Sequence, residues 1–136
     1  QHEGIGVMVW SPLAGGFITG KFRRDQDAPE DARRSGFDFP PVDKERVYQI
    51  VEVMDTVASN HNASVAQVAL AWLIHQPGVV AIPGASSVEQ VESNAAVADL
   101  SLTDAEVADL TTQARAFTPL SALQSGRAVI RRRLSR

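Results

Sequence analysis

A glycine-rich stretch near the N-terminus combines the residue types that a phosphate-binding loop needs. Gly15 and Gly20 let backbone N–H groups approach a ligand closely. Ser11 adds a hydroxyl group and Lys21 adds a positive charge. The spacing of the glycines before Lys21 matches most of a P-loop, but Phe22 stands where that motif places the Ser or Thr that ligates magnesium. The stretch therefore favours phosphate binding and argues against nucleotide triphosphate hydrolysis, with a plain glycine-rich turn as the alternative.

A second loop, residues 82–90, brings hydroxyl groups to the start of a predicted helix. The free N–H groups of a helix start, together with the hydroxyls of Ser86 and Ser87, suit a phosphate. Each serine is also followed, three positions later, by an acidic or amide residue, which is the capping-box pattern. Simple capping is thus the alternative, although both roles use the same groups. Gln90 and Asn94 are four residues apart, on one helix face that can reach a purine edge.

Both loops follow predicted strands. Residues 5–10 form a short apolar run without clean alternation, which indicates a parallel strand that is buried on both faces. Residues 79–82 form a second, β-branched run that ends at Pro83. Because ligands of parallel α/β folds bind at the carboxyl ends of the strands, we expect the two loops to lie together. Trp10 ends the first strand, where it can stack on a flat ring or pack in the core.

Four helices are predicted around these strands, each from its apolar spacing and a capping residue. The expected ranges are 43–60, 64–76, 86–97 and a last helix that begins at the Thr103–Glu106 capping box. Tyr48 falls in the middle of the first of these helices, which we expect to lie far from the loops. Residues 23–42 are polar, contain prolines and are expected to be irregular.

Strands that alternate with helices imply parallel pairing and an α/β fold. Two strands alone leave both outer edges of the sheet open and its apolar faces half covered. We therefore expect the chain to be part of a larger α/β structure. Its open edges favour a partner, a dimer or aggregation.

Composition and charge narrow the function classes. The chain has 136 residues, a net charge of −3 and no cysteine, which excludes disulfides and thiolate metal sites and fits a reducing, cytoplasmic location. No apolar run approaches the roughly 18 residues of a membrane span, and the N-terminus lacks the pattern of a signal peptide. The histidines show no metal-ligand spacing, so no metal is expected.

The basic residues gather in a C-terminal tail. Residues 127–136 hold five arginines and no acidic residue. No aromatic side chain interleaves with these arginines as a stacking platform for nucleic acid needs. We expect residues 117–136 to be a solvated, weakly structured tail, and nucleic acid is not an expected partner.

Several segments resemble the aldo-keto reductases in their order and spacing. Residues 6–22 resemble the strand-seven segment of that family, and residues 69–73 with 79–94 resemble its last barrel helix, strand eight and cofactor loop. The resemblance covers residues 4–115 and is nearest to bacterial reductases related to potassium-channel β subunits. It implies the C-terminal portion of a (β/α)8 TIM barrel, incomplete as a barrel by itself, with an oxidoreductase domain over residues 1–116.

The same resemblance implies an extended NADP(H) site on this chain and a carbonyl substrate in the full-length enzyme. The implied cofactor-binding residues are Trp10 at the nicotinamide ring, Ser11, Pro12, Leu13, Ala14, Gly15 and Lys21 at the pyrophosphate, Arg33 from the long polar loop, Gly84, Ala85 and Ser86 at the 2′-phosphate, and Gln90 and Asn94 at the adenosine.

The chain also departs from the family pattern. Gly84 and Gln90 stand where the best-known branch has a lysine and an arginine, so NAD(H) is an alternative to NADP(H). The family's catalytic tyrosine, lysine, aspartate and histidine lie in the first half of the barrel, and no catalytic residue is expected here. The resemblance therefore implies the cofactor-binding half of an NADP(H)-dependent reductase that transfers hydride between the cofactor and an aldehyde or ketone. The alternative is a non-catalytic nucleotide-binding or partner-binding barrel fragment.

Overall fold

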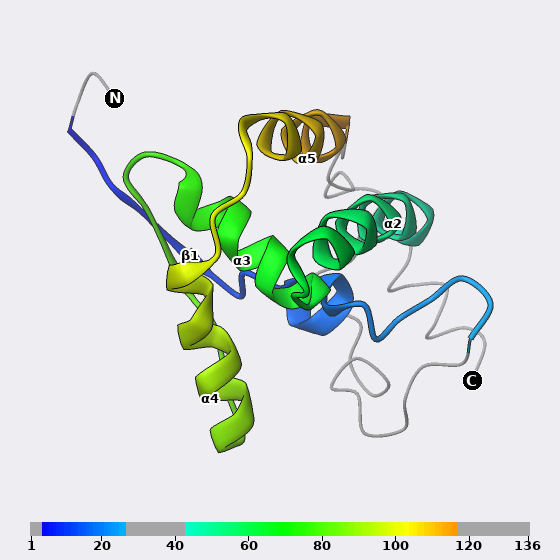
Figure 1. The fold of residues 1–136 in the computed structure, drawn as a ribbon, viewed down its shortest axis with the longest axis horizontal. Coiled ribbons are helices and arrows are strands. Elements are labelled where there is room, and N and C mark those ends of the chain that lie inside the picture. The colour runs from blue at the N-terminus through cyan, green and yellow to red at the C-terminus, as the bar shows by residue number, and fades with distance from the viewer. Residues whose placement is uncertain (1–3, 27–42, 117–136) are drawn as a thin grey trace, which may run out of the picture.

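In the part of the chain that the structure describes, two parallel strands have a set of helices gathered on one side of them (Figure 1). The structure, a computed structural model, describes residues 4–26 and 43–116. In chain order the elements are β1 (Val7–Trp10), the 3-10 helix η1 (Ala14–Thr19), α2 (Lys44–His61), α3 (Val65–His75), β2 (Val79–Ile82), α4 (Val88–Ala95), the 3-10 helix η2 (Ala96–Asp99) and α5 (Asp104–Ala116). This order confirms the α/β class predicted from the sequence.

The helices α2 and α3 begin at the capping residues that the sequence predicts. The Asp43 carboxylate accepts hydrogen bonds from the backbone N–H groups of Glu45 and Arg46 at 3.1 and 3.3 Å, which caps α2. Ser64 and Gln67 form a reciprocal capping box at the start of α3, with N–O distances of 2.8 and 3.2 Å. These acceptors satisfy N–H groups that the first helical turn leaves unpaired, so both starts are encoded locally.

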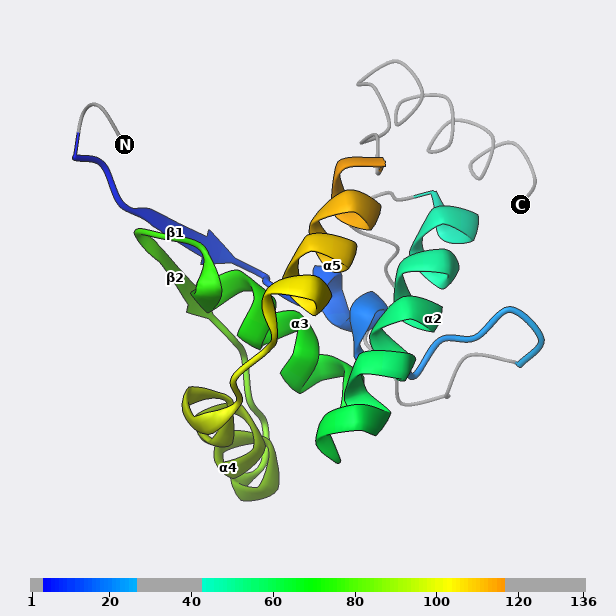
Figure 2. The same cartoon turned by 45° about the horizontal axis from the view of Figure 1, so that its top comes forward.

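The core lies between α2, α3 and α5. Val51 of α2 is 1% exposed, Val68 of α3 is 0% exposed and Leu110 of α5 is 2% exposed. Figure 2 shows the strands, α3 and the α2–α5 pair following one another as layers. Because these buried side chains come from three helices, their packing fixes α2, α3 and α5 as one unit on one face of the sheet.

The other face of the sheet is exposed. The parallel register pairs Met8 with Val80 and Trp10 with Ile82. These four side chains share a face, because side chains alternate along a strand, and they are 46–76% exposed. Among the described residues, the burial on both faces that the apolar runs predict is not seen, whereas the expectation that two strands alone leave the apolar faces half covered is met. The physical reason is that the described helices cover only the face that carries Ala81, which packs against the core.

Several element boundaries differ from the predicted ones. β1 begins at Val7, α2 continues to His61, and α4 ends at Ala95 so that Val97 lies in η2. The glycine-rich stretch contains η1 instead of an irregular loop throughout. These ends depend on single backbone conformations that apolar spacing does not reveal: Asn62, for example, adopts a left-handed conformation that ends α2.

Two predicted segments fall wholly or partly outside the described residues. They are the polar stretch, of which residues 27–42 are not described, and the basic tail over residues 117–136. Within the described ranges no helix combines the length and the apolar character that crossing a membrane requires.

Candidate functional site

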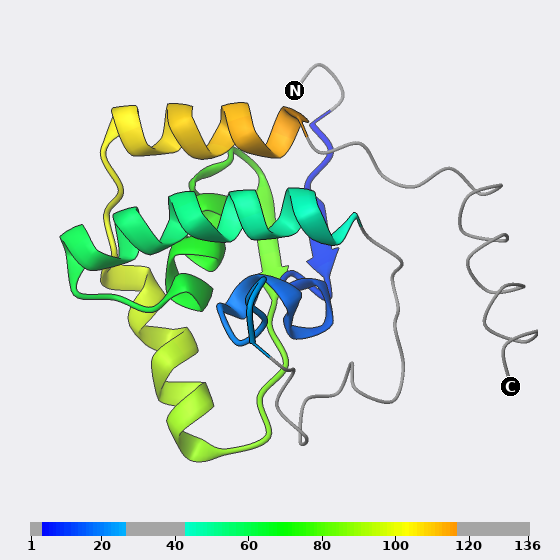
Figure 3. The ribbon, with the colours of Figure 1, turned by 90° about the vertical axis from the view of Figure 1, so that its right-hand side faces the viewer.

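The two predicted loops meet at one edge of the sheet. Trp10 and Ile82, the last residues of β1 and β2, are register partners in a parallel pair. Figure 3 shows both strand arrows ending close to η1 and to the segment that leads into α4. The prediction that the loops lie together is confirmed, since both leave the sheet at its carboxyl end.

The first loop contains a run of left-handed backbone conformations. Ser11 and Ala14 have φ angles of 53° and 51°, and Gly15 and Gly16 have φ angles of 66° and 95°. For the two residues that carry a Cβ atom, this region costs roughly 1–2 kcal/mol each. Strained backbone of this kind concentrates at functional sites, where the surrounding contacts hold it in place.

Aromatic packing anchors η1 to the core. Phe17 is 3% exposed and stacks on Phe22 with ring centroids 5.0 Å apart and an interplanar angle of 6°. Tyr48 of α2 lies 6.0 Å from the Phe17 ring, so the prediction that this tyrosine is far from the loops is wrong. The cause is the packing of α2 against η1, a non-local contact that helix periodicity cannot show. Phe22 is accordingly a core residue, in agreement with the rejection of a P-loop.

An arginine that the sequence analysis missed fixes the end of this loop. The Arg23 Nε donates a hydrogen bond to the carbonyl oxygen of Gly20 at 2.8 Å. Its two terminal nitrogens contact both carboxylate oxygens of Asp55 on α2, one of them at 2.9 Å. The hydrogen bond to Asp55 raises the pKa of Arg23 above its ordinary value. The pair spans 32 positions of sequence, so only the glycine-rich context before Arg23 could have drawn attention to it.

The second loop uses its polar groups to cap α4. The Ser87 hydroxyl oxygen accepts a hydrogen bond from the backbone N–H of Gln90 at 3.4 Å. The side-chain oxygen of Gln90 turns back and accepts from the backbone N–H and hydroxyl of Ser86 at 2.8 and 3.2 Å. The Ser87 hydroxyl also lowers the pKa of Glu89 below its usual range. Of the two capping pairs that the sequence allows, the structure selects Ser87 with Gln90.

Both loops leave open space beside their backbones. A Cβ atom added to Gly84 or to Gly16 would meet no other atom within 4 Å. Trp10 is 76% exposed at the end of β1, so its ring is free to be covered by a flat ligand. An exposed indole, two accessible backbone segments and a helix start with serine hydroxyls are groups that fit an extended dinucleotide.

The structure brings most of the predicted binding residues to this edge. Lys21 is exposed and forms no hydrogen bond or ion pair with any other described residue. Pro12, which belongs to the first loop, is buried, and Asn94 is half-buried in α4. Arg33 belongs to the residues that the structure does not describe. The placement of the other predicted binding residues is observed, whereas their binding roles stay predictions.

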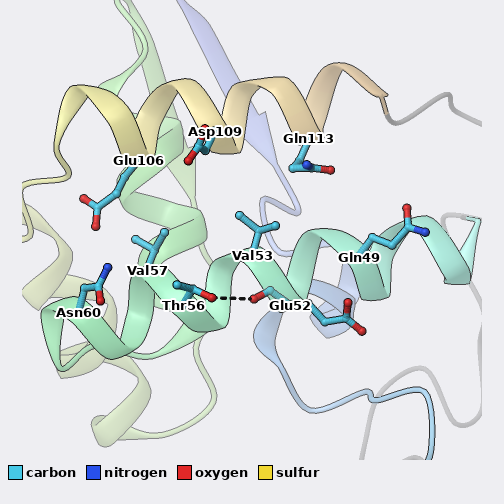
Figure 4. Close-up of a pocket in the computed structure, with 9 residues that line it drawn as sticks. All are labelled: Gln49, Glu52, Val53, Thr56, Val57, Asn60, Glu106, Asp109 and Gln113. Atoms are coloured by element: carbon cyan, nitrogen blue, oxygen red, sulfur yellow. Dashed lines mark hydrogen bonds between the residues drawn. The ribbon is translucent and has the colours of Figure 1, made fainter.

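A separate groove lies between α2 and α5, and Figure 4 shows it. Its volume is about 610 Å³, and its lining residues are Gln49, Glu52, Val53, Thr56, Val57, Asn60, Glu106, Asp109 and Gln113. None of the predicted cofactor-binding residues is among them. In the part of the chain that the structure describes, no group of three or more His, Asp or Glu side chains is placed to hold a metal ion.

Three relatives are similar to this chain over most of its length. An uncharacterized oxidoreductase of Mycobacterium tuberculosis is 42% identical over 130 residues, which cover 96% of this chain and 40% of the relative. The NADP(+) aldo-keto reductase yakc of Schizosaccharomyces pombe is 31% identical, covering 81% and 33%. The NADH-specific methylglyoxal reductase of Escherichia coli is 32% identical, covering 78% and 32%. The chain thus spans 32–40% of the length of these relatives.

A solved structure and a family model agree with these relatives. The crystal structure of a thermostable aldo-keto reductase in complex with the inhibitor epalrestat is similar with a TM-score of 0.58 and 26% sequence identity. The similarity covers 83% of this chain and 31% of that one. The model of the Aldo/keto reductase family matches residues 1–114. Since this match includes both loops and every described helix except the last residues of α5, the chain belongs to the aldo/keto reductase family.

Proposed function

We propose that this chain is the C-terminal portion of an aldo-keto reductase barrel and supplies the cofactor-binding half of the enzyme. In this assignment β1 and β2 are strands seven and eight. The whole protein would transfer hydride between NADP(H) and an aldehyde or ketone. The observation that carries the proposal is the meeting of two glycine- and serine-bearing loops at the carboxyl edge of paired parallel strands.

Different residues at this edge of the sheet would contact different parts of the cofactor. Trp10 would stack on the nicotinamide ring, and the backbone from Ser11 to Gly15 would line the pyrophosphate, with Lys21 adding positive charge. Gly84, Ala85 and Ser86 at the start of α4 would hold the adenosine-side phosphate, and Gln90 and Asn94 would contact the adenosine. Arg33 would approach from the polar stretch.

The preference between NADP(H) and NAD(H) depends on the charges of the residues around the adenosine-side phosphate. Residues 83–94 contain two acidic residues and no lysine or arginine. A 2′-phosphate placed there would be held by N–H groups and hydroxyls, without the direct attraction of a cation. NADP(H) is the expected cofactor, and NAD(H) should also bind. The two relatives with named cofactors differ in the same way, one being an NADP(+) enzyme and the other NADH-specific.

When bound, the nicotinamide cofactor supplies the hydride for carbonyl reduction. The residues of this chain would bind it and fix its orientation, which lowers the entropic part of the barrier. The proton that completes the alcohol has to come from a residue outside this edge. Tyr48 is not assigned this role, because its ring packs against Phe17 in the core.

The test is NADPH oxidation by the full-length protein with a panel of aldehydes and ketones. We expect NADPH loss to match alcohol formation one for one. The 136-residue chain alone should show no turnover, since the catalytic tetrad is expected elsewhere. Turnover by the purified chain would contradict that placement of the tetrad. A folded full-length protein that reduces no carbonyl compound would contradict the proposed activity.

The alternative, a non-catalytic barrel fragment that binds a partner, draws on a different observation. The sheet face made by Met8, Trp10, Val80 and Ile82 is exposed and apolar. An uncovered apolar face favours association with another chain. Cofactor binding by the full-length protein without any carbonyl reduction would favour this alternative.

A further inference from the structure

We propose that Arg23 and Asp55 form a positioning pair that holds the cofactor-binding loop in its binding-competent shape; this inference rests on the proposed function. The guanidinium is planar, and binding both oxygens of Asp55 fixes its orientation relative to α2. Its remaining Nε–H points at the Gly20 carbonyl at 2.8 Å. The pair therefore fixes the backbone directly before Lys21, the one cation of the loop.

The surroundings of Gly20 also restrict the backbone that the Arg23–Asp55 pair holds. Gly20 has a φ of +80°, and a Cβ atom added to it would lie 2.9 Å from Arg23 Nη2 and 3.2 Å from Val65 Cγ2. The loop end is thus enclosed between the guanidinium on one side and α3 on the other. Within η1, three positions before Gly20, Phe17 is buried in the core. Ala14, Gly15 and Gly16 come directly before Phe17, and their left-handed conformations need support from their neighbours.

The adjacent arginine provides a matched control. Arg24 forms ion pairs with Glu45 and Glu52 of the same helix at 2.6 and 3.6 Å, with a side chain that is 45% exposed against 33% for Arg23. Within the described residues, no hydrogen bond of Arg24 reaches the loop backbone. Arg24→Gln therefore removes a link between the same segment and the same helix without releasing Gly20.

The first measurement is cofactor affinity in the full-length protein, by NADPH fluorescence titration and steady-state kinetics. Arg23→Gln and Asp55→Asn should each raise the Kd for NADPH about tenfold. At saturating cofactor kcat should stay nearly constant, because the loop contacts phosphates that do not change during hydride transfer. Arg23→Lys keeps the charge but loses the two-pronged contact, so it should fall between wild type and Arg23→Gln. Arg24→Gln should stay within about twofold of wild type.

The second measurement follows hydrogen exchange of the amides of residues 14–21 in the cofactor-free protein. Arg23→Gln should speed their exchange about tenfold, whereas Arg24→Gln should not. If the two arginine variants have the same Kd and the same exchange rates, the positioning role is wrong. If Arg23→Gln fails to fold, Arg23→Lys carries the same comparison. A wild-type protein that binds no nicotinamide cofactor overturns the proposed function itself, and that result is seen before any variant is made.

Discussion

Gly20 lies where the first loop, Arg23 and α3 meet. Its φ of +80° and the closeness of Val65 to the position that a Cβ atom would take leave no room for a side chain. We predict that Gly20→Ala lowers the free energy of unfolding by about 1–2 kcal/mol, because alanine is strained at positive φ and crowds its neighbours. Urea unfolding measures the change. Gly84→Ala is the control, since its Cβ meets nothing within 4 Å and should shift stability by less than about 0.5 kcal/mol. Equal losses in the two variants would contradict the structure.

Gly84 also allows a test of cofactor preference at the residue scale. Gly84→Lys places a cation beside the start of α4 with space around it. We predict that it tightens NADPH relative to NADH about fivefold to tenfold, because only NADPH carries the 2′-phosphate. Gly84→Gln adds similar length without charge and should leave the ratio of the two Kd values unchanged. If the ratio of the two Kd values is unchanged in Gly84→Lys, the adenosine-side phosphate does not bind at this loop.

Single residues were predictable where their neighbours are close in sequence. Ser87 and Gln90 could be paired in advance, because a capping motif needs only three positions of spacing. Arg23 and Asp55 could not be paired, because 32 residues separate them and only the fold brings them together. Trp10 was placed at the site edge from its position at a strand end, but its exposure depends on the uncovered sheet face.

The start of α5 shows how one element is stabilised by charge. The Glu106 carboxylate accepts from the Thr103 backbone N–H at 2.9 Å and contacts the His61 ring at the end of α2 at 2.9 Å. The backbone N–H of Thr103, followed by His61, lowers the pKa of Glu106 to about 2. The ionised glutamate thus joins α5 to α2.

This lowered pKa predicts an acid-sensitive stability. The unfolded chain would protonate Glu106 near its ordinary pKa of about 4.3, so the folded state loses an advantage of order 2 kcal/mol as the pH falls from about 5 towards 2. Glu106→Gln keeps a residue suited to the capping box but has no charge to lose. Denaturant midpoints across this pH range should therefore decline more steeply in wild type than in Glu106→Gln. Parallel pH profiles would show that Glu106 does not couple the helices.

Elements with local start signals were predicted well from sequence. The starts of α2, α3, α4 and α5 all coincide with predicted capping residues. η1 was not predicted, because its turns depend on left-handed conformations at Ala14, Gly15 and Gly16 and on the burial of Phe17. Capping and periodicity signals depend on the local chain, whereas a 3-10 segment of this kind is stabilised by tertiary packing.

Within residues 4–26 and 43–116, the sheet is covered on one face. Helices pack on the Ala81 side, while Met8, Trp10, Val80 and Ile82 face outwards. We predict that the 136-residue chain alone associates in a concentration-dependent way. Association would bury these apolar side chains and pair the open edges of the sheet. Sedimentation velocity at several concentrations measures this. Met8→Lys combined with Val80→Lys should reduce the association, and a chain that stays monomeric at every concentration would contradict the prediction.

For the whole molecule, the resemblance to a known family identified the family, which the hydrophobic and capping patterns could not do. Strand and helix order predicted an incomplete α/β structure, but only the motif match identified the aldo/keto reductase family, which the comparisons confirm. The nearness to reductases related to potassium-channel β subunits stays a prediction. The substrate could not be inferred, because the loops that would contact it are expected outside these residues.

The most direct test of the central claim is a crystal structure of the full-length protein with bound NADP(H). We predict that the nicotinamide ring covers Trp10, that the pyrophosphate lies along the backbone from Ser11 to Gly15, and that the adenosine end reaches the start of α4 at Gly84–Ser86. A cofactor bound at other strands, with both loops left in solvent, would contradict the account.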